Sequence, residues 1–300
     1  AAVVLAGCSR SATTGSLPGA PTLEQLKNLT YEGIEEDPVK LSDGLWEGDP
    51  FVEGSALRPS VRLVGDFVLT GDLDGRPGDE AVVLLSNNEG GTGDFVHLAV
   101  VGHREGELRC LGTVSLGDRV QVVSAVVTDE KPRRVEMELL EAGPDDGACC
   151  PGNLVKHAWT FGSMGLTPQA FDTEPRRLSL DVLADREWVL RHWDREEKAP
   201  DEPEVTLSYD EGRFAGSNGC NNYFSAVEEG GSPGEITVGP GGATKMFCPD
   251  PAGSIEQRFG QLLGSVNRYG FVAGQLVLSY EFEGRYGAMI FEGRERKETE

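Results

Sequence analysis

Short apolar segments separated by turn-forming residues limit most strongly how this chain can fold. Val135, Met137 and Leu139 alternate with glutamates, which is the period of two typical of a strand with one buried face. Residues 81–85 are continuously apolar, as expected of a strand buried on both faces. We also predict strands at residues 61–64, 67–69, 95–101 and 120–127. Clusters of Gly, Asp and Pro divide these segments, and the chain has 40 glycines, so we expect antiparallel sandwich- or barrel-like sheets.

Length and charge limit the organisation and the partners of the chain. A length of 300 residues predicts two domains, a β-rich one at 24–167 and a second at 185–293, joined by a linker at 168–184. Residues 294–300 form a charged tail, and the expected fold class is mainly β. The formal net charge of −23 repels phosphate backbones, so we expect no nucleic-acid partner. No apolar run is long enough for a membrane-spanning helix.

Residues 1–8 read AAVVLAGC, which we interpret as the remainder of a secretory signal. Leu5-Ala6-Gly7-Cys8 resembles the bacterial lipobox, whose cysteine accepts acyl chains. Residues 9–23 are small, polar and rich in Pro and Gly, as expected of a flexible tether. The resemblance implies a lipoprotein attached to a membrane through Cys8. Ser9 after that cysteine implies the periplasmic side of the outer membrane. The alternative is a chance run of small residues before an ordinary cysteine.

An acidic loop at residues 71–80 is a candidate calcium site. Asp72, Asp74, Asp79 and Glu80 supply the oxygen ligands that calcium prefers, and Gly75 permits a sharp bend. The loop is similar to the calcium loops of FG-GAP repeats, although Thr70 stands where that pattern has its first acid. The alternative is a hairpin turn in which the Asp and Gly residues serve geometry alone.

In an exported chain, cysteines are expected to form disulfides. A lipidated Cys8 leaves five others, and the chain has no CxxC pair, so neither a thioredoxin-like site nor a zinc ribbon is predicted. Adjacent cysteines rarely bridge each other, so we expect one of the two to pair with Cys110. Cys150 is the favoured partner, and Cys149 stays open as the alternative. A redox-active pair at Cys149 and Cys150 is the open alternative.

The second half of the chain contains two separated motifs. Gly219-Cys220-Asn221 is followed by Tyr223, and Thr244-x-Met246-x-Cys248 comes about thirty residues later. Together they resemble the META domain of HslJ-type bacterial envelope proteins, over about residues 185–292. The resemblance implies a Cys220–Cys248 disulfide and a small antiparallel barrel-like sheet with one packed helix. Gly219, Asn221, Thr244 and Met246 are the positions that carry the family motif.

A single clear helix is predicted after Pro251. Its apolar residues recur at helical spacing and predict one buried face: Ile255, Phe259, Leu262, Leu263 and Val266. Ser254 is expected to cap the helix, with Gln257 completing a capping box.

The resemblance implies a non-enzymatic envelope lipoprotein that binds a partner or protects against stress. The chain lacks HExxH, and its four histidines lack the spacing of metal ligands. Three alternatives stay open. They are an enzyme built on a carboxylate pair, a calcium-dependent adhesion protein that uses the middle domain, and an assembly factor like the secretin pilots. The expected partners are the membrane and an envelope protein.

Overall fold

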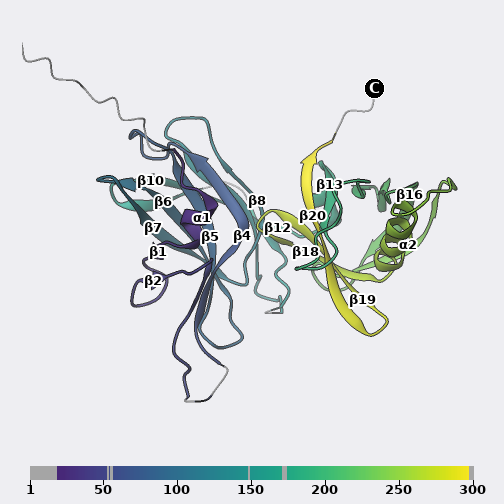
Figure 1. The fold of residues 1–300 in the computed structure, drawn as a ribbon, viewed down its shortest axis with the longest axis horizontal. Coiled ribbons are helices and arrows are strands. Elements are labelled where there is room, and N and C mark those ends of the chain that lie inside the picture. The colour runs from purple at the N-terminus through teal and green to yellow at the C-terminus, as the bar shows by residue number, and fades with distance from the viewer. Residues whose placement is uncertain (1–18, 53, 55–56, 148, 171–173, 297–300) are drawn as a thin grey trace, which may run out of the picture.

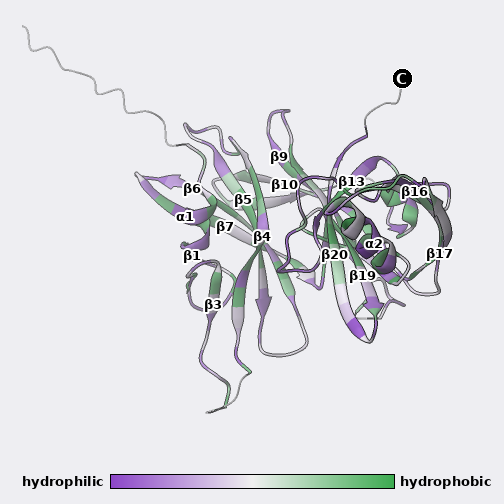
Figure 2. Ribbon diagram, turned by 45° about the vertical axis from the view of Figure 1, so that its right-hand side comes forward, coloured by the Kyte–Doolittle hydropathy of each residue, from purple (hydrophilic) through white to green (hydrophobic). Residues whose placement is uncertain are grey.

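The structure is a computed structural model that describes residues 19–52, 54, 57–147, 149–170 and 174–296 (Figure 1). It confirms a mainly β fold, with curled antiparallel sheets and one packed helix. The N-terminal strands and the C-terminal strands lie at opposite ends of the long axis (Figure 1). Along many strands hydrophobic and hydrophilic residues alternate (Figure 2), as a sheet with one buried face requires.

The first large sheet has five strands in the order β3-β4-β5-β6-β7. Their bounds are Leu45–Glu47, Ser60–Gly71, Glu80–Asn88, Phe95–Arg104 and Glu107–Asp118. β5 is buried along nearly its whole length, which confirms the prediction for residues 81–85. Segments 61–64 and 67–69 belong to one strand, β4, which is interrupted by a bulge before Val68. Gly65 adopts a φ of 55° at that interruption, a value that glycine tolerates.

A second sheet faces the first, in the order β11-β10-β9-β8, with β12 pairing β10. The bounds are Gln121–Val127 for β8, Arg134–Glu141 for β9, Asn153–Gly162 for β10, Gly165–Gln169 for β11 and Arg176–Arg177 for β12. Val135, Met137 and Leu139 point into the core between the sheets, where they meet Leu84 and Leu98. The two sheets therefore form a sandwich whose core is the alternating apolar set.

The outer face of the first sheet is covered by a short N-terminal segment. α1 (Leu23–Lys27) is followed by β1 (Thr30–Tyr31) and β2 (Val39–Lys40). Leu26 and Tyr31 are fully buried against this face, together with Val83 and Ala99. A Thr22–Gln25 capping box fixes the start of α1. This cover explains why β5 and β6 are apolar on both faces.

The C-terminal half forms an eight-stranded sheet in the order β17-β16-β15-β14-β13-β20-β19-β18. The bounds are Arg186–His192 for β13, Thr206–Asp210 for β14, Arg213–Ser217 for β15, Asn222–Glu229 for β16, Ile236–Ala243 for β17, Val266–Val272 for β18, Gln275–Phe282 for β19 and Arg285–Glu295 for β20. The sheet curls until Glu235, next to β17, forms an antiparallel β-bridge with Arg268 of β18. α2 (Ala252–Leu263) packs on it (Figure 2).

The start of α2 differs from the prediction. The helix begins at Ala252, Pro251 occupies the N-cap position, and no side chain caps it there. The predicted Ser254–Gln257 capping box is therefore wrong. The side chain and backbone N of Ser254 instead donate to the Asp250 carboxylate, at 2.6 and 3.2 Å. The predicted apolar face is buried, although Val266 already belongs to β18.

The two halves of the molecule share contacts. Gln121 Oε1 accepts a 2.8 Å hydrogen bond from Phe271 N, and Gly274 N donates to Val122 O at 2.8 Å. The segment predicted as a linker contains β12 and the 3-10 helix η1 (Leu180–Leu183), whose two leucines are buried in the C-terminal core. Within the described ranges, no helix is both long and apolar enough to span a membrane.

Candidate functional site

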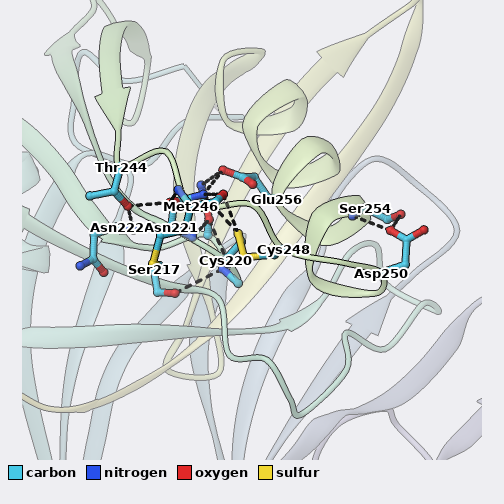
Figure 3. The surroundings of a disulfide bond; sticks show 12 residues. Ser217, Cys220, Asn221, Asn222, Thr244, Met246, Cys248, Asp250, Ser254 and Glu256 are labelled. Carbon is cyan, nitrogen blue, oxygen red and sulfur yellow. Dashed lines mark hydrogen bonds between the residues drawn. A yellow bond between two sulfur atoms is a disulfide. The ribbon is translucent and has the colours of Figure 1, made fainter.

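The Cys220–Cys248 disulfide lies at the centre of the C-terminal motifs (Figure 3). It confirms the predicted pairing, and the two Cα atoms are 6.0 Å apart. Gly219 precedes it with a φ of 91°, and a Cβ there would lie 2.8 Å from Cγ2 of Ile255. A side chain at this position would meet both backbone strain and α2. The glycine therefore lets the turn pack directly on the helix.

Asn221 joins the two motifs through its buried amide. Its Oδ1 accepts from Thr244 Oγ1 at 2.7 Å and from Met246 N at 2.8 Å. Its Nδ2 donates to Met246 O at 3.2 Å and to Glu256 Oε1 at 3.0 Å (Figure 3). Four hydrogen bonds thus connect the turn, the residue 244–248 segment and α2, which makes this asparagine the organising residue of the motif.

Two neighbouring residues complete the network, Asn218 through its side chain and Met246 through its backbone. Asn218 Oδ1 accepts from Cys220 N at 3.1 Å and from Asn221 N at 2.6 Å, which shapes the turn. Met246 contributes its backbone N and O, while its side chain is 61% exposed. Phe247 beside it is 93% exposed. In the Thr-x-Met-x-Cys pattern, Met246 therefore contributes through its backbone, whereas Thr244 and Cys248 contribute through their side chains.

An open groove of about 610 Å³ lies next to this turn. Thr206, Ser217, Asn222 and the backbone of Gly216 line it, with Glu187, Glu202 and Glu204 at its acidic side. Tyr223 also lines it; its hydroxyl donates to Thr206 O at 3.1 Å, and burial raises its pKa well above the usual range. The groove thus combines hydroxyl, amide and carboxylate groups on a rigid sheet.

One arginine organises the acidic side of the groove. Arg294 Nε contacts Glu187 Oε2 at 2.6 Å, and its two terminal nitrogens contact the Glu204 carboxylate at 3.1 and 3.0 Å. These contacts raise the pKa of the Arg294 guanidinium. The forked geometry fixes two carboxylates in place at the groove edge.

Residues 181–290 match the META domain family. This stretch of the chain is a META domain. The match includes the disulfide, the Asn221 network and α2. A search of curated proteins gives no significant match. An NMR structure of a protein from Burkholderia xenovorans is 22% identical, covers 43% of this chain and 100% of its own, and has a TM-score of 0.31.

Outside the META domain, the structure brings three of the four predicted calcium ligands together. Single oxygens of Asp72, Asp74 and Glu80 lie within 4.8 Å of one another, and Asp79 is not part of the cluster. Arg104 contacts Asp74 at 2.5 Å and Glu80 at 3.6 Å. Because an arginine and backbone amides already hold these carboxylates, the cluster is suited to stabilising the loop, and calcium binding stays a prediction.

The backbone of the acidic loop confirms its turn geometry. Gly75 N donates to Asp72 Oδ1 at 2.7 Å, and Leu73 N donates to Glu80 Oε2 at 2.9 Å. Glu80 is 3% exposed, and desolvation, with smaller effects from neighbouring acids, raises its pKa. These hydrogen bonds to the loop backbone agree with the alternative interpretation, in which the Asp and Gly residues serve turn geometry.

The expected Cys110–Cys150 disulfide is wrong. Cys149 and Cys150 are bonded to each other, and Cys110 is a free, half-buried thiol whose pKa is raised by burial. Cys110 belongs to β7 in the first sheet, whereas Cys150 lies in the β9–β10 connection of the second sheet. The two therefore lie in different layers of the sandwich, a separation that the linear sequence does not reveal.

Two further features of the described chain concern residue types that are common in catalytic sites. The GxSxG spacing of serine hydrolases is matched by Gly230-Gly231-Ser232-Pro233-Gly234, which lies in the β16–β17 connection. Its first three residues, including Ser232, are exposed, and Gly234 is buried. The nucleophile elbow of those enzymes is a strand-to-helix turn. His97 is buried, which lowers its pKa, and its Nδ1 has no hydrogen-bond partner in the described structure. Cys8, the predicted lipidation site, lies outside the described residues.

Proposed function

We propose that this protein is an exported envelope lipoprotein, attached through Cys8, whose META domain is a non-enzymatic binding or stress-protective module. The META match at residues 181–290 suggests a stress-related or envelope-associated role. The lipobox-like Leu5–Cys8 sequence supports the anchor, and two disulfides support an oxidising compartment. The proposal places the protein on the periplasmic side of the outer membrane.

The groove beside the Asn221 network is the observation that carries the binding role. Its floor is β-sheet, and the adjacent turn is fixed by a disulfide and four hydrogen bonds. Its lining, as far as the structure describes it, contains polar side chains but neither histidine nor cysteine. A preorganised polar surface of this kind favours recognition of an envelope protein segment over covalent chemistry.

Membrane attachment is tested by expressing the chain with its native export signal in a bacterium, beside a Cys8→Ala variant. We expect the wild-type protein in the membrane fraction, with acyl mass on the peptide that begins at Cys8. The variant should move to the soluble envelope fraction. A mature wild-type protein whose Cys8 carries no acyl chain would refute the anchor.

The binding role is tested with a photo-crosslinking residue at Asn222, inside the groove, and a matched one at Glu283, in the exposed β19–β20 turn. Crosslinking is done in intact envelopes, and the products are identified by mass spectrometry. We expect a discrete partner adduct from position 222 alone. The same products from both positions would count against the groove.

A further inference from the structure

The Cys149–Cys150 disulfide is a chemical group that the proposed function leaves unused. It lies in the loop at residues 142–152 between β9 and β10, of which the structure describes 142–147 and 149–152. Cys149 is exposed and Cys150 is buried. The other described cysteines, Cys110, Cys220 and Cys248, are half-buried. A thiolate arriving from solvent therefore reaches Cys149 more readily than any other cysteine in the described chain.

This loop also holds the segment that leads into the META domain. Asp146 accepts from the backbone N of Gly143 and of Gly152, both at 2.8 Å. The same carboxylate receives the Arg177 guanidinium at 2.7 and 3.0 Å. Leu178 N donates to Gly152 O at 2.8 Å. The loop conformation thus fixes β12 immediately before the buried residues of η1.

The loop also faces the META domain across a pocket. The pocket has a volume of about 560 Å³ and is lined by both cysteines, by Arg177, and by Ser232 and Pro233 of the β16–β17 connection. A Cβ on Gly152 would lie 2.6 Å from Cγ of Pro233. The disulfide is therefore positioned where a change of loop shape is transmitted to the other domain.

We propose that Cys149–Cys150 is a thiol–disulfide exchange site for a protein dithiol, and that its redox state sets how firmly the 142–152 loop holds the META domain. The proposal rests on the bond, the exposure of Cys149 and the contacts of the loop. It does not depend on the lipid anchor or on the groove.

The exchange balances as a two-electron transfer. A thiolate of the dithiol attacks Cys149 Sγ, the Cys149–Cys150 bond breaks, and Cys150 leaves as a thiolate that takes up a proton. The second thiol of the dithiol loses its proton and attacks the first sulfur of the dithiol, which is bonded to Cys149 in the mixed disulfide. Cys149 leaves and takes up a proton. The dithiol is oxidised to a disulfide, and the two cysteines are reduced.

Reduction opens the ring that joins the two adjacent residues, so the backbone around Cys149 gains conformations. The Asp146 contacts to Gly152 and Arg177 depend on that backbone. We therefore expect reduction to loosen residues 142–153, β12 and the β16–β17 connection together, while the Cys220–Cys248 region keeps its structure.

The test uses the full oxidised chain, with dithiothreitol as the dithiol probe and alkylation followed by mass spectrometry. We expect Cys149 and Cys150 to be alkylated at about tenfold lower dithiothreitol than Cys220 and Cys248. Amide hydrogen exchange should then rise at residues 142–153, 176–178 and 230–235. A Cys149→Ser/Cys150→Ser variant should show the same rise without reductant, and Cys110→Ser should behave like wild type.

Two outcomes would overturn the proposal. Equal resistance of both disulfides in the folded protein would exclude a selective exchange site. Selective reduction without any change of exchange at residues 230–235 would exclude the coupling to the META domain. In the second case, amide exchange at residues 230–235 should also be the same in the Cys149→Ser/Cys150→Ser variant and in the wild type. Because the variant has no disulfide at this site, that result cannot come from incomplete reduction.

Discussion

Replacing Asn221 with alanine removes the side chain that connects the two META motifs. The change deletes four hydrogen bonds to Thr244, Met246 and Glu256. A typical hydrogen bond contributes about 0.5–1.5 kcal/mol net, and buried groups left unpaired cost more. Thr244 and Met246 are exposed, so water can partly replace their lost partner. We therefore expect a loss of about 2–3 kcal/mol in the local opening free energy.

The assay must report on the META domain alone, because a chain with two cores need not unfold in one step. Amide hydrogen exchange of β16 and β17 meets this need, since it gives opening free energies for single segments. Asn222→Ala is the matched control, because Asn222 is the adjacent residue and its side chain is exposed. We expect the control to change the opening free energy by less than about 0.5 kcal/mol.

Equal losses for Asn221→Ala and Asn222→Ala would refute the reasoning. That result would mean that the disulfide alone fixes the turn and that the asparagine network contributes nothing measurable. Repeating the comparison with the Cys220–Cys248 bond reduced would then show whether the network becomes important only without the disulfide.

Three further predictions concern other sites. Arg177 and backbone amides lower the pKa of Asp146 to about 2, below its unfolded value of about 3.9. The stability that Asp146 adds is present above pH 4 and is lost as the pH falls toward 2. The free energy of unfolding should therefore fall less steeply between pH 4 and pH 2 in Asp146→Asn than in the wild type. Arg104→Gln should destabilise the N-terminal domain by about 2–3 kcal/mol in thermal melts, because the buried side chains of Asp74 and Glu80 lose the cation they share. Arg76→Gln is the control, because the exposed Arg76 side chain lies 3.6 Å from Asp74 alone. Gly219→Ala should lower the free energy of unfolding by about 1–3 kcal/mol in a urea titration, since the new Cβ meets Ile255 at a positive φ. Gly231→Ala, with open space around it, should lower it little.

Local patterns predicted the elements whose burial is periodic. Val135, Met137 and Leu139 identified one face of β9, and the apolar run at 81–85 identified a strand covered on both sides. The helical stripe from Ile255 to Leu263 was equally readable. These features are properties of adjacent residues, so the sequence contains them directly.

Features that depend on which distant segments of the chain come together were not predictable. The choice between Cys110 and Cys149 as the partner of Cys150 depends on which sheet each strand joins, and β7 and β10 fall in different layers. The role of Arg104 beside Asp74 is likewise invisible, because thirty residues separate them in the chain. The groove near Asn222 is assembled from β13 to β16 and has no linear signature.

Disulfide mapping of the protein recovered from a bacterial envelope tests the central claim most directly. Proteolysis without reductant, after alkylation of free thiols, should release one crosslinked product that joins the peptides of Cys220 and Cys248. A single peptide should contain the bonded Cys149 and Cys150, and Cys110 should be alkylated. Recovery of Cys220 or Cys248 in alkylated form, or joined to any other cysteine, would contradict an oxidised META domain built around this bond.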